Sequence, residues 1–252
     1  AQEYALRDIA VDLAGERVAA VSEDGTTVVL APRGERADEV PAAQETEVLT
    51  DRGTDLLQPA WDVFGDLWLV DRTPDGARLS VRHDDSWARL DAPGLTGVDV
   101  SAFTVSRDGT RLVAVEERPS GDRLLMARVV RDAEGEVRAL TRAEELPFDQ
   151  GAIDEIRDVA WSAPGSLAVL TSPTPATTSV LPVLVDGSSS FADADPSAET
   201  LRHRADRLVA SPSAEAPLYV ADPGGELFEL GPDGEWVGVV LDGPLRAPTY
   251  VG

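Results

Sequence analysis

Short apolar runs alternate with polar turns along the whole chain, and one local pattern recurs among them. In each copy an apolar residue is followed by Asp or Ser, and a small residue stands three positions after that polar one. A second apolar run then begins, such as the Leu-Val-Ala-Val of residues 112–115. Because Asp108-Gly109 suits a tight turn with positive φ at the glycine, each copy predicts a β-hairpin. The apolar residues that align the copies are Val11, Trp61, Val105, Trp161 and Ala210.

The copies lie about 50 residues apart, a period that is typical of a β-propeller with several short strands per repeat. We therefore predict an all-β chain that forms a single β-propeller of five four-stranded antiparallel blades. Six blades are the alternative, because residues 32–58 or 186–206 could hold an additional blade. The expected blades, within one domain covering 1–252, are roughly 4–50, 51–96, 97–150, 151–203 and 204–252.

The strand pattern is clearest in the last three repeats. The expected strands are 102–106, 111–115, 124–130 and 137–141, then 157–161, 166–170, 179–185 and a weak strand near 200–204, then 207–211, 218–222, 226–230 and 235–241. Pro182 lacks a backbone donor and is expected near a strand end or a bulge. Segments 139–146 and 197–208 have a helical pattern. Either residues 1–6 or the tail 247–252 is expected to complete the last blade. The expected core includes Val11, Trp61, Val105, Trp161, Val169 and Val220.

Charge and composition exclude several classes of partner and metal site. Asp plus Glu number 46 against 22 Lys plus Arg, which gives a formal net charge of −24. Such a surface repels polyanions, so nucleic acids and anionic membranes are disfavoured as partners. The chain has no Cys and only two His, which excludes disulfides, cysteine metal sites and a zinc site of histidines alone. His83 and His203 are expected to be ordinary surface residues, and we expect neither metal nor cofactor.

No apolar run approaches the ~20 residues that a membrane span needs, and the N-terminus lacks the pattern of a signal peptide. The chain is therefore expected to be cytosolic, already processed, or a fragment of a longer protein.

Carboxylates near the start of the innermost strands are the candidates for chemistry. Glycoside hydrolases with five-bladed propellers place two or three acidic residues in the central channel. Two interpretations stay open here: a catalytic carboxylate pair, or salt-linked neighbours (Arg7–Asp8, Arg157–Asp158 and Asp206–Arg207) that close the channel mouth. The absence of a nucleophile or metal motif favours the second. The polar residues expected at the mouth are Arg7, Asp8, Gln58, Arg157, Asp158, Asp206 and Arg207.

The tryptophans fall into two groups. Trp61 and Trp161 occupy equivalent positions in their repeats, which predicts that they pack between blades. Trp87 and Trp236 open outer strands and are expected to be partly exposed. Since exposed aromatic and arginine side chains dominate many interfaces, the expected partner contacts are Arg82, Trp87, Arg89 and Trp236.

One ordered set of segments resembles a known family. These segments are "LLQPAWDVFGDLWLVDR" (56–72), "TVSRDGTRLVAV" (104–115), "IRDVAWSAPGSLAVL" (156–170), "VLVDG" (183–187) and "PTYVG" (248–252). Together they resemble the C-terminal propeller of the actinobacterial LpqB lipoproteins. The resemblance implies an extracytoplasmic protein, tethered by an N-terminal lipid, that works with the MtrA–MtrB two-component system by contacting the sensor histidine kinase MtrB. It transfers no catalytic residue.

Family members also carry an N-terminal portion with a spore-germination-type domain and a lipidated cysteine. This portion is expected to be absent here, so we expect an excised, monomeric propeller whose only link to the membrane is a lipid anchor outside the chain. Two function classes remain: a non-enzymatic interaction module that modulates a sensor kinase, and a carbohydrate-active or carbohydrate-binding propeller at the cell wall. An open channel with two free carboxylates would favour the second, and a channel filled by Arg–Asp pairs the first.

Overall fold

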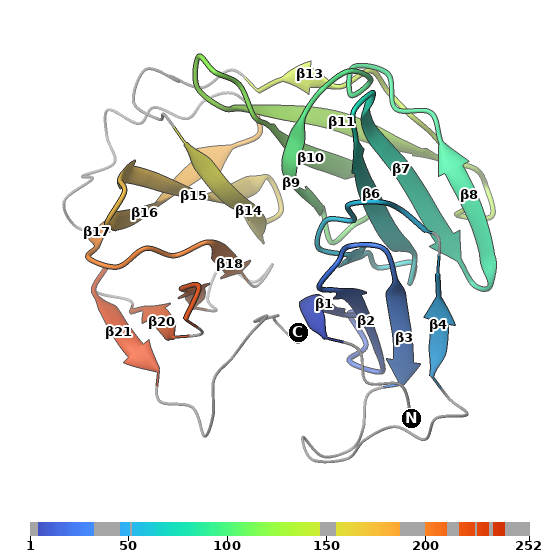
Figure 1. Ribbon diagram of the computed structural model, residues 1–252. Coiled ribbons are helices and arrows are strands. Elements are labelled where there is room, and N and C mark those ends of the chain that lie inside the picture. The colour runs from blue at the N-terminus through green and yellow to red at the C-terminus, as the bar shows by residue number, and fades with distance from the viewer. Residues whose placement is uncertain are drawn as a thin grey trace.

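The computed structural model describes residues 5–32, 46–50, 52–146, 155–186, 200–210, 217–224, 226–231 and 234–239. Within these ranges every regular element is a β-strand, and the strands form separate sheets around a central axis (Figure 1). No helix long and apolar enough to cross a membrane occurs in this part of the chain.

The sheets are five blades, each built from strands that are consecutive in sequence and pair antiparallel. The first blade contains β1 (Leu6–Val11), β2 (Arg17–Ser22), β3 (Val28–Pro32) and β4 (Glu47–Leu49), and the second contains β5 (Ala60–Trp61), β6 (Leu67–Thr73), β7 (Gly76–His83) and β8 (Ser86–Leu90). The third contains β9 (Val100–Val105), β10 (Arg111–Glu116), β11 (Arg123–Arg131) and β12 (Val137–Leu140), with β13 (Glu144–Glu145) also paired to β11.

The fourth blade contains β14 (Ile156–Ala163), β15 (Ser166–Thr174), β16 (Thr177–Leu184) and β17 (Thr200–Leu201), and the fifth contains β18 (Arg207–Ala210), β19 (Leu218–Ala221), β20 (Leu227–Leu230) and β21 (Trp236–Val239). The prediction of five blades rather than six is therefore confirmed. The aligned apolar positions lie on the first strand of each blade, which is the strand nearest the axis in Figure 1.

The recurring turn forms as predicted in the third blade. Gly109 has a φ of 64°, a conformation that glycine adopts without steric cost. Its N–H donates to the Ser106 carbonyl at 2.8 Å, and the Ser106 hydroxyl donates to Asp108 at 2.6 Å. The same hydroxyl oxygen accepts the backbone N–H of Arg111 at 2.9 Å, so the polar residue of the motif closes the hairpin.

The two segments with a helical pattern are not helices, and that expectation is wrong. Residues 139–146 contain the end of β12 and all of β13, and Leu146 is buried against the fourth blade. In the other segment, β17 and β18 bury Leu201 and Leu208, while residues 197–199 lie outside the described ranges. Isolated helices of this length are marginal, so strand pairing and burial decide the conformation.

Pro182 lies inside β16, opposite Ala168 of β15, rather than at a strand end or bulge as expected. β16 pairs with β17 only at Thr178 and Ser179, so Pro182 occupies the part of the strand that has one described neighbour. A missing N–H is tolerated at such a position.

The segments expected to complete the last blade are only partly described. Leu6 pairs with Ser22 inside the first blade. Residues 1–4 and the tail 247–252 lie outside the described ranges.

Four of the seams between neighbouring blades hold a cluster of buried apolar side chains, which extends through the described parts of blades one to five. Trp61 and Trp161 pack in these seams as predicted, as does Val105, and Val169 and Val220 are fully buried. Val11 is only half-buried, against expectation. Its equivalents face the preceding blade, and the described residues form no apolar cluster between the fifth blade and the first.

Candidate functional site

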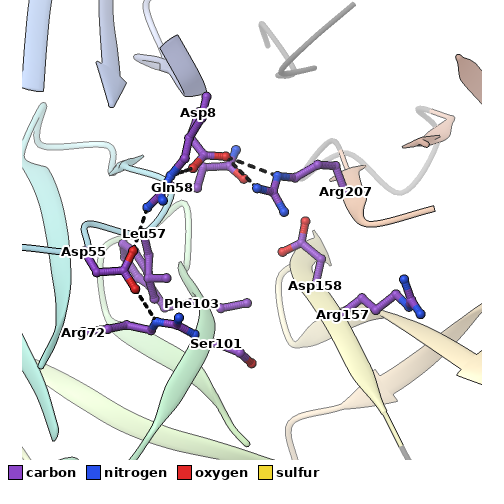
Figure 2. Close-up of a pocket in the computed structure, with 12 residues that line it drawn as sticks. Asp8, Asp55, Leu57, Gln58, Arg72, Ser101, Phe103, Arg157, Asp158 and Arg207 are labelled. Carbon is purple, nitrogen blue, oxygen red and sulfur yellow. Dashed lines mark hydrogen bonds and ion pairs between the residues drawn. The ribbon is translucent and has the colours of Figure 1, made fainter. Parts of the chain in front are cut away.

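The innermost strands surround a polar cavity of about 200 Å³ at the centre of the ring (Figure 2). Of the residues expected at the channel mouth, those that line it are Arg7, Asp8, Gln58, Arg157, Asp158 and Arg207. Asp206 does not line it. The Asp206 N–H donates to the Ala221 carbonyl of β19, and its own carbonyl accepts a hydrogen bond from Arg207. The expected salt link between Asp206 and Arg207 is therefore replaced by a backbone contact.

Asp8 is buried and joins the two ends of the ring. Its Oδ2 accepts a hydrogen bond from Nε of the neighbouring Arg7 at 3.1 Å, as expected for that pair. Its Oδ1 lies 2.9 Å from Nη2 of Arg207, which belongs to the fifth blade. Desolvation lowers the pKa of Arg207, but the charges of Asp8 and Asp158 outweigh it and raise the pKa above its usual value. The Asp8–Arg207 ion pair thus connects the fifth blade to the first.

Asp158 connects the fourth blade to the fifth. Its carboxylate accepts the backbone N–H of Val159 at 2.9 Å and that of Leu208, in the fifth blade, at 2.8 Å. Burial raises the pKa of Asp158 to about 6, although Arg207 and the two amides act in the opposite direction. Arg157 does not pair with Asp158, against expectation, because backbone amides occupy the carboxylate. Its guanidinium lies 3.2 Å from Glu155 instead.

Asp55 is a channel residue that sequence reasoning missed. It accepts hydrogen bonds from Nε of Arg72 at 2.8 Å and from Nη2 of Arg7 at 3.2 Å. Burial favours a higher pKa for Asp55, but the bonds from Arg72 and Arg7 outweigh burial and lower it. Arg7 also donates to the Leu56 carbonyl, so one guanidinium ties the first blade to the segment that enters the second. Asp55 and Arg72 lie outside the recurring hairpin motif, although the bond from the Arg72 N–H to the Asp55 carbonyl has a counterpart between Glu117 and Asp99 in the third blade.

All three carboxylates of the cavity are therefore held by donors of the chain itself. Asp8 and Asp55 are bound by arginines, as Figure 2 shows, and Asp158 is bound by backbone amides. A glycosidase needs one carboxyl group free to protonate the leaving oxygen and a second facing the sugar or a water. Within the described ranges, no three His, Asp or Glu side chains gather as a metal site would require. The arrangement is that of a structural network.

A second buried charged cluster lies between the second and third blades. Asp62 and Asp66 are almost fully buried, and Arg131 of β11 bridges them. Nδ1 of His83 lies 2.5 Å from Asp66, and this hydrogen bond raises the pKa of His83. His83 is therefore not an ordinary surface residue, against expectation. Sequence reasoning missed the cluster because Arg131 lies 69 residues from Asp62.

The expected partner contacts differ in exposure. Arg89 is exposed, and Trp87 and Trp236 are half-buried against apolar seams. Arg82 is not the exposed residue that was expected. Its side chain is only 11% exposed and pairs with Glu47 at 2.7 Å and Asp85 at 2.9 Å. A role in partner binding for the other three stays a prediction.

A family model described as the lipoprotein LpqB beta-propeller domain matches residues 1–250. The chain belongs to this family. A lipoprotein LpqB of Streptomyces avermitilis is 27% identical over 98% of the chain and 39% of its own length. One of Streptomyces coelicolor is 32% identical over 73% of the chain and 30% of its own length. The chain thus spans well under half of these relatives.

Solved structures show the same fold at low identity. TolB from Acinetobacter baumannii superposes with a TM-score of 0.61 and 14% identity, over 92% of this chain and 53% of that one. A chain of the nidogen/laminin complex gives a TM-score of 0.58 and 11% identity, over 90% of this chain and 76% of that one. At these identities the likeness shows the propeller fold alone.

Proposed function

We propose that this propeller is a non-enzymatic interaction module of an extracytoplasmic lipoprotein, which binds the extracytoplasmic domain of an MtrB-like sensor histidine kinase and modulates it. The observation that carries the non-enzymatic part is the engagement of all three channel carboxylates by the chain's own donors. Family membership supports the location, because the relatives are named as lipoproteins. In this proposal a lipid anchor outside the chain provides the only link to the membrane, and the propeller acts as a monomer.

The shape of the ring suits this role. Four apolar seams make the blades a rigid platform, and the loops at either rim are free to vary without disturbing it. A net charge of −24 disfavours nucleic acids and steers the choice of protein partner. If the facing surface of the kinase domain is basic, association accelerates at low ionic strength.

The test titrates the purified propeller with the kinase's extracytoplasmic domain by calorimetry at two salt concentrations. We expect a one-to-one complex with a dissociation constant of tens of micromolar or tighter, which corresponds to about 6 kcal/mol or more. An absence of heat at that concentration contradicts the partner assignment. A nucleic-acid titration serves as the negative control.

A glycan-active propeller is the second candidate, and one observation favours it. The pKa of Asp158, at about 6, lies where a catalytic acid is effective, and the residue lines a polar cavity. The deciding assay incubates the chain with cell-wall glycans and chromogenic glycosides. Turnover that disappears in Asp8→Asn or Asp158→Asn would establish the enzyme, and we expect none.

A further inference from the structure

A pocket with apolar character lies away from the channel, beside the turns that follow the innermost strands. It has a volume of about 420 Å³, and we call it the Trp161 pocket. Its lining residues are Val63, Ser106, Arg107, Asp108, Arg111, Trp161, Ala163 and Pro164. Val63 belongs to the second blade, Arg107 and its neighbours to the third, and Trp161 to the fourth. The Val63 N–H donates to the Arg107 carbonyl at 3.0 Å, which holds the second and third blades together at the pocket.

Trp161 lines this pocket with its ring. The residue is only 6% exposed, and its Nε1 is buried without a hydrogen-bond acceptor among the described residues. A buried donor without a partner carries a desolvation cost. Because Nε1 is closed off from solvent, the pocket offers a ligand the ring rather than this donor.

The equivalent tryptophan of the second blade shows what a completed site looks like. Nε1 of Trp61 donates to the Ala10 carbonyl at 3.3 Å, and the guanidinium of Arg17 lies over its ring at 4.5 Å. Arg17 is held there by Asp12, at 2.9 Å, and by the Gly65 carbonyl, at 3.2 Å. This tryptophan is covered by its own chain.

In the third and fourth blades the covering residues have changed. Arg111 takes the place of Arg17, but Ser106 replaces Asp12 and offers no charge to hold the guanidinium. The side chains of Arg111 and Arg107 form no hydrogen bond with any described residue, although, against the effect of burial, the charge of Arg111 helps to lower the pKa of Asp108. Asp108 itself is held within its turn by Ser106 and Thr110. The pocket thus combines a buried tryptophan ring, over which no described guanidinium is stacked, with two arginines whose side chains form no hydrogen bond to a described residue.

Apolar surface continues beyond the pocket. Val63 is 56% exposed and Phe64 48% exposed, and both lie on the turn of the second blade at its edge. Phe64 packs beneath Arg131 and against Gly109, on the turn that supplies Ser106 and Asp108. A small molecule in the pocket would leave this strip in water, whereas an extended segment would cover both.

We propose that the Trp161 pocket binds an extended protein segment that presents one apolar side chain next to a carboxylate. The apolar side chain enters the pocket against the Trp161 ring, and the carboxylate pairs with Arg107 or Arg111. These two arginines form a locally positive site on a strongly acidic chain, which orients an acidic segment as it docks. The proposal rests on the proposed function in one respect: the segment belongs to the partner protein.

The first test uses the indole N–H signals of the five tryptophans in a nitrogen–proton NMR spectrum. The probe is a pool of capped hexapeptides in which two aspartates flank one leucine, methionine, phenylalanine or tryptophan. We expect the Trp161 signal to shift saturably at submillimolar peptide while the Trp61 signal stays in place. Peptides with lysine in place of aspartate should bind at least about tenfold more weakly. A Trp161 signal that does not move, or equal binding of the lysine peptides, overturns the proposal.

The second test separates the pocket from the proposed function. The kinase domain is titrated against the wild type, Arg111→Glu, Val63→Ser and the control Arg138→Glu, whose side chain lies on strand β12 and is 60% exposed. We expect the two pocket variants to weaken binding about tenfold or more and the control to leave it unchanged. If the pocket variants bind the kinase domain as tightly as the wild type, the pocket proposal is contradicted and the proposed function is supported. If the peptides bind at Trp161 but the kinase domain does not bind, the proposed function is contradicted and the pocket proposal is supported.

Discussion

In the central channel each carboxylate is bound by an arginine or a backbone amide of another segment, whereas in the Trp161 pocket an indole N–H and two guanidinium groups form no hydrogen bond with the described residues. Both regions are concave and both carry charge. In the channel the charged groups join the first, second, fourth and fifth blades. In the pocket the same kinds of group are left available.

The difference shows why a polar cavity at the centre of a propeller is weak grounds for assigning chemistry. The described residues form apolar clusters at four seams, and at the fifth the ring is joined by Asp8 and Arg207. Removing these groups should therefore change stability before it changes function. Removing the pocket groups should do the opposite, since little of the fold depends on them.

The largest expected effect concerns Asp158 and pH. Its folded pKa of about 6 lies above the ordinary 3.8, so the stability linked to its protonation is complete below 3.8 and is lost as pH rises through 6. The full effect is on the order of 3 kcal/mol. Urea unfolding of the wild type and Asp158→Asn from pH 7.5 to pH 4 should show the wild type gaining on the variant as pH falls. A constant difference between them would show that Asp158 titrates normally.

Gly109 tests the recurring turn, which in the third blade borders the Trp161 pocket. Gly109→Val should cost about 1–3 kcal/mol, because a β-branched residue at a φ of 64° is strained and its Cβ would lie 2.9 Å from Arg131 and 3.1 Å from Phe64. Gly238→Val is the control, since that Cβ meets nothing within 4 Å. Equal melting temperatures for the two variants would contradict the prediction.

The two equivalent tryptophans sharpen the comparison directly. Trp61→Phe loses a hydrogen bond and the stacked Arg17, but Trp161→Phe removes a donor that has no acceptor. We expect Trp61→Phe to be the more destabilising by about 1 kcal/mol in urea unfolding. If Trp161→Phe lowers the free energy of unfolding as much as Trp61→Phe or more, the indole N–H of Trp161 has an acceptor in solution.

The smallest effect concerns His83. Hydrogen bonding to Asp66 raises its pKa above 6.5, so its contribution to stability is complete below 6.5 and is lost as pH rises through the higher folded value. His83→Gln should therefore be less stable than the wild type at pH 6, with the gap narrowing toward pH 8.5. A stability difference that grows as pH rises would contradict a raised pKa for His83.

The repeated residues explain what sequence could predict. Val105, Trp161 and Gly109 sit at fixed places in each hairpin, so the blades, their seams and the cavity-lining positions follow from local pattern. Asp55, Arg72 and Arg131 lie outside the recurring hairpin motif, and their side-chain partners are set by the fold. The Trp161 pocket also depends on a change within the repeat, Ser106 where the first copy has Asp12, whose consequence appears only when Arg17 and Arg111 are compared in three dimensions.

The most direct measurement of whether the channel charges hold the ring together is a double-mutant cycle on Asp8 and Arg207. Asp8→Asn, Arg207→Gln and the double variant are unfolded in urea at low salt, and the coupling energy is the departure from additivity. The ion pair is partly buried, so we predict a favourable coupling of about 1–2 kcal/mol that decreases in high salt. Additive effects, with coupling under about 0.3 kcal/mol, would contradict a structural role for the channel.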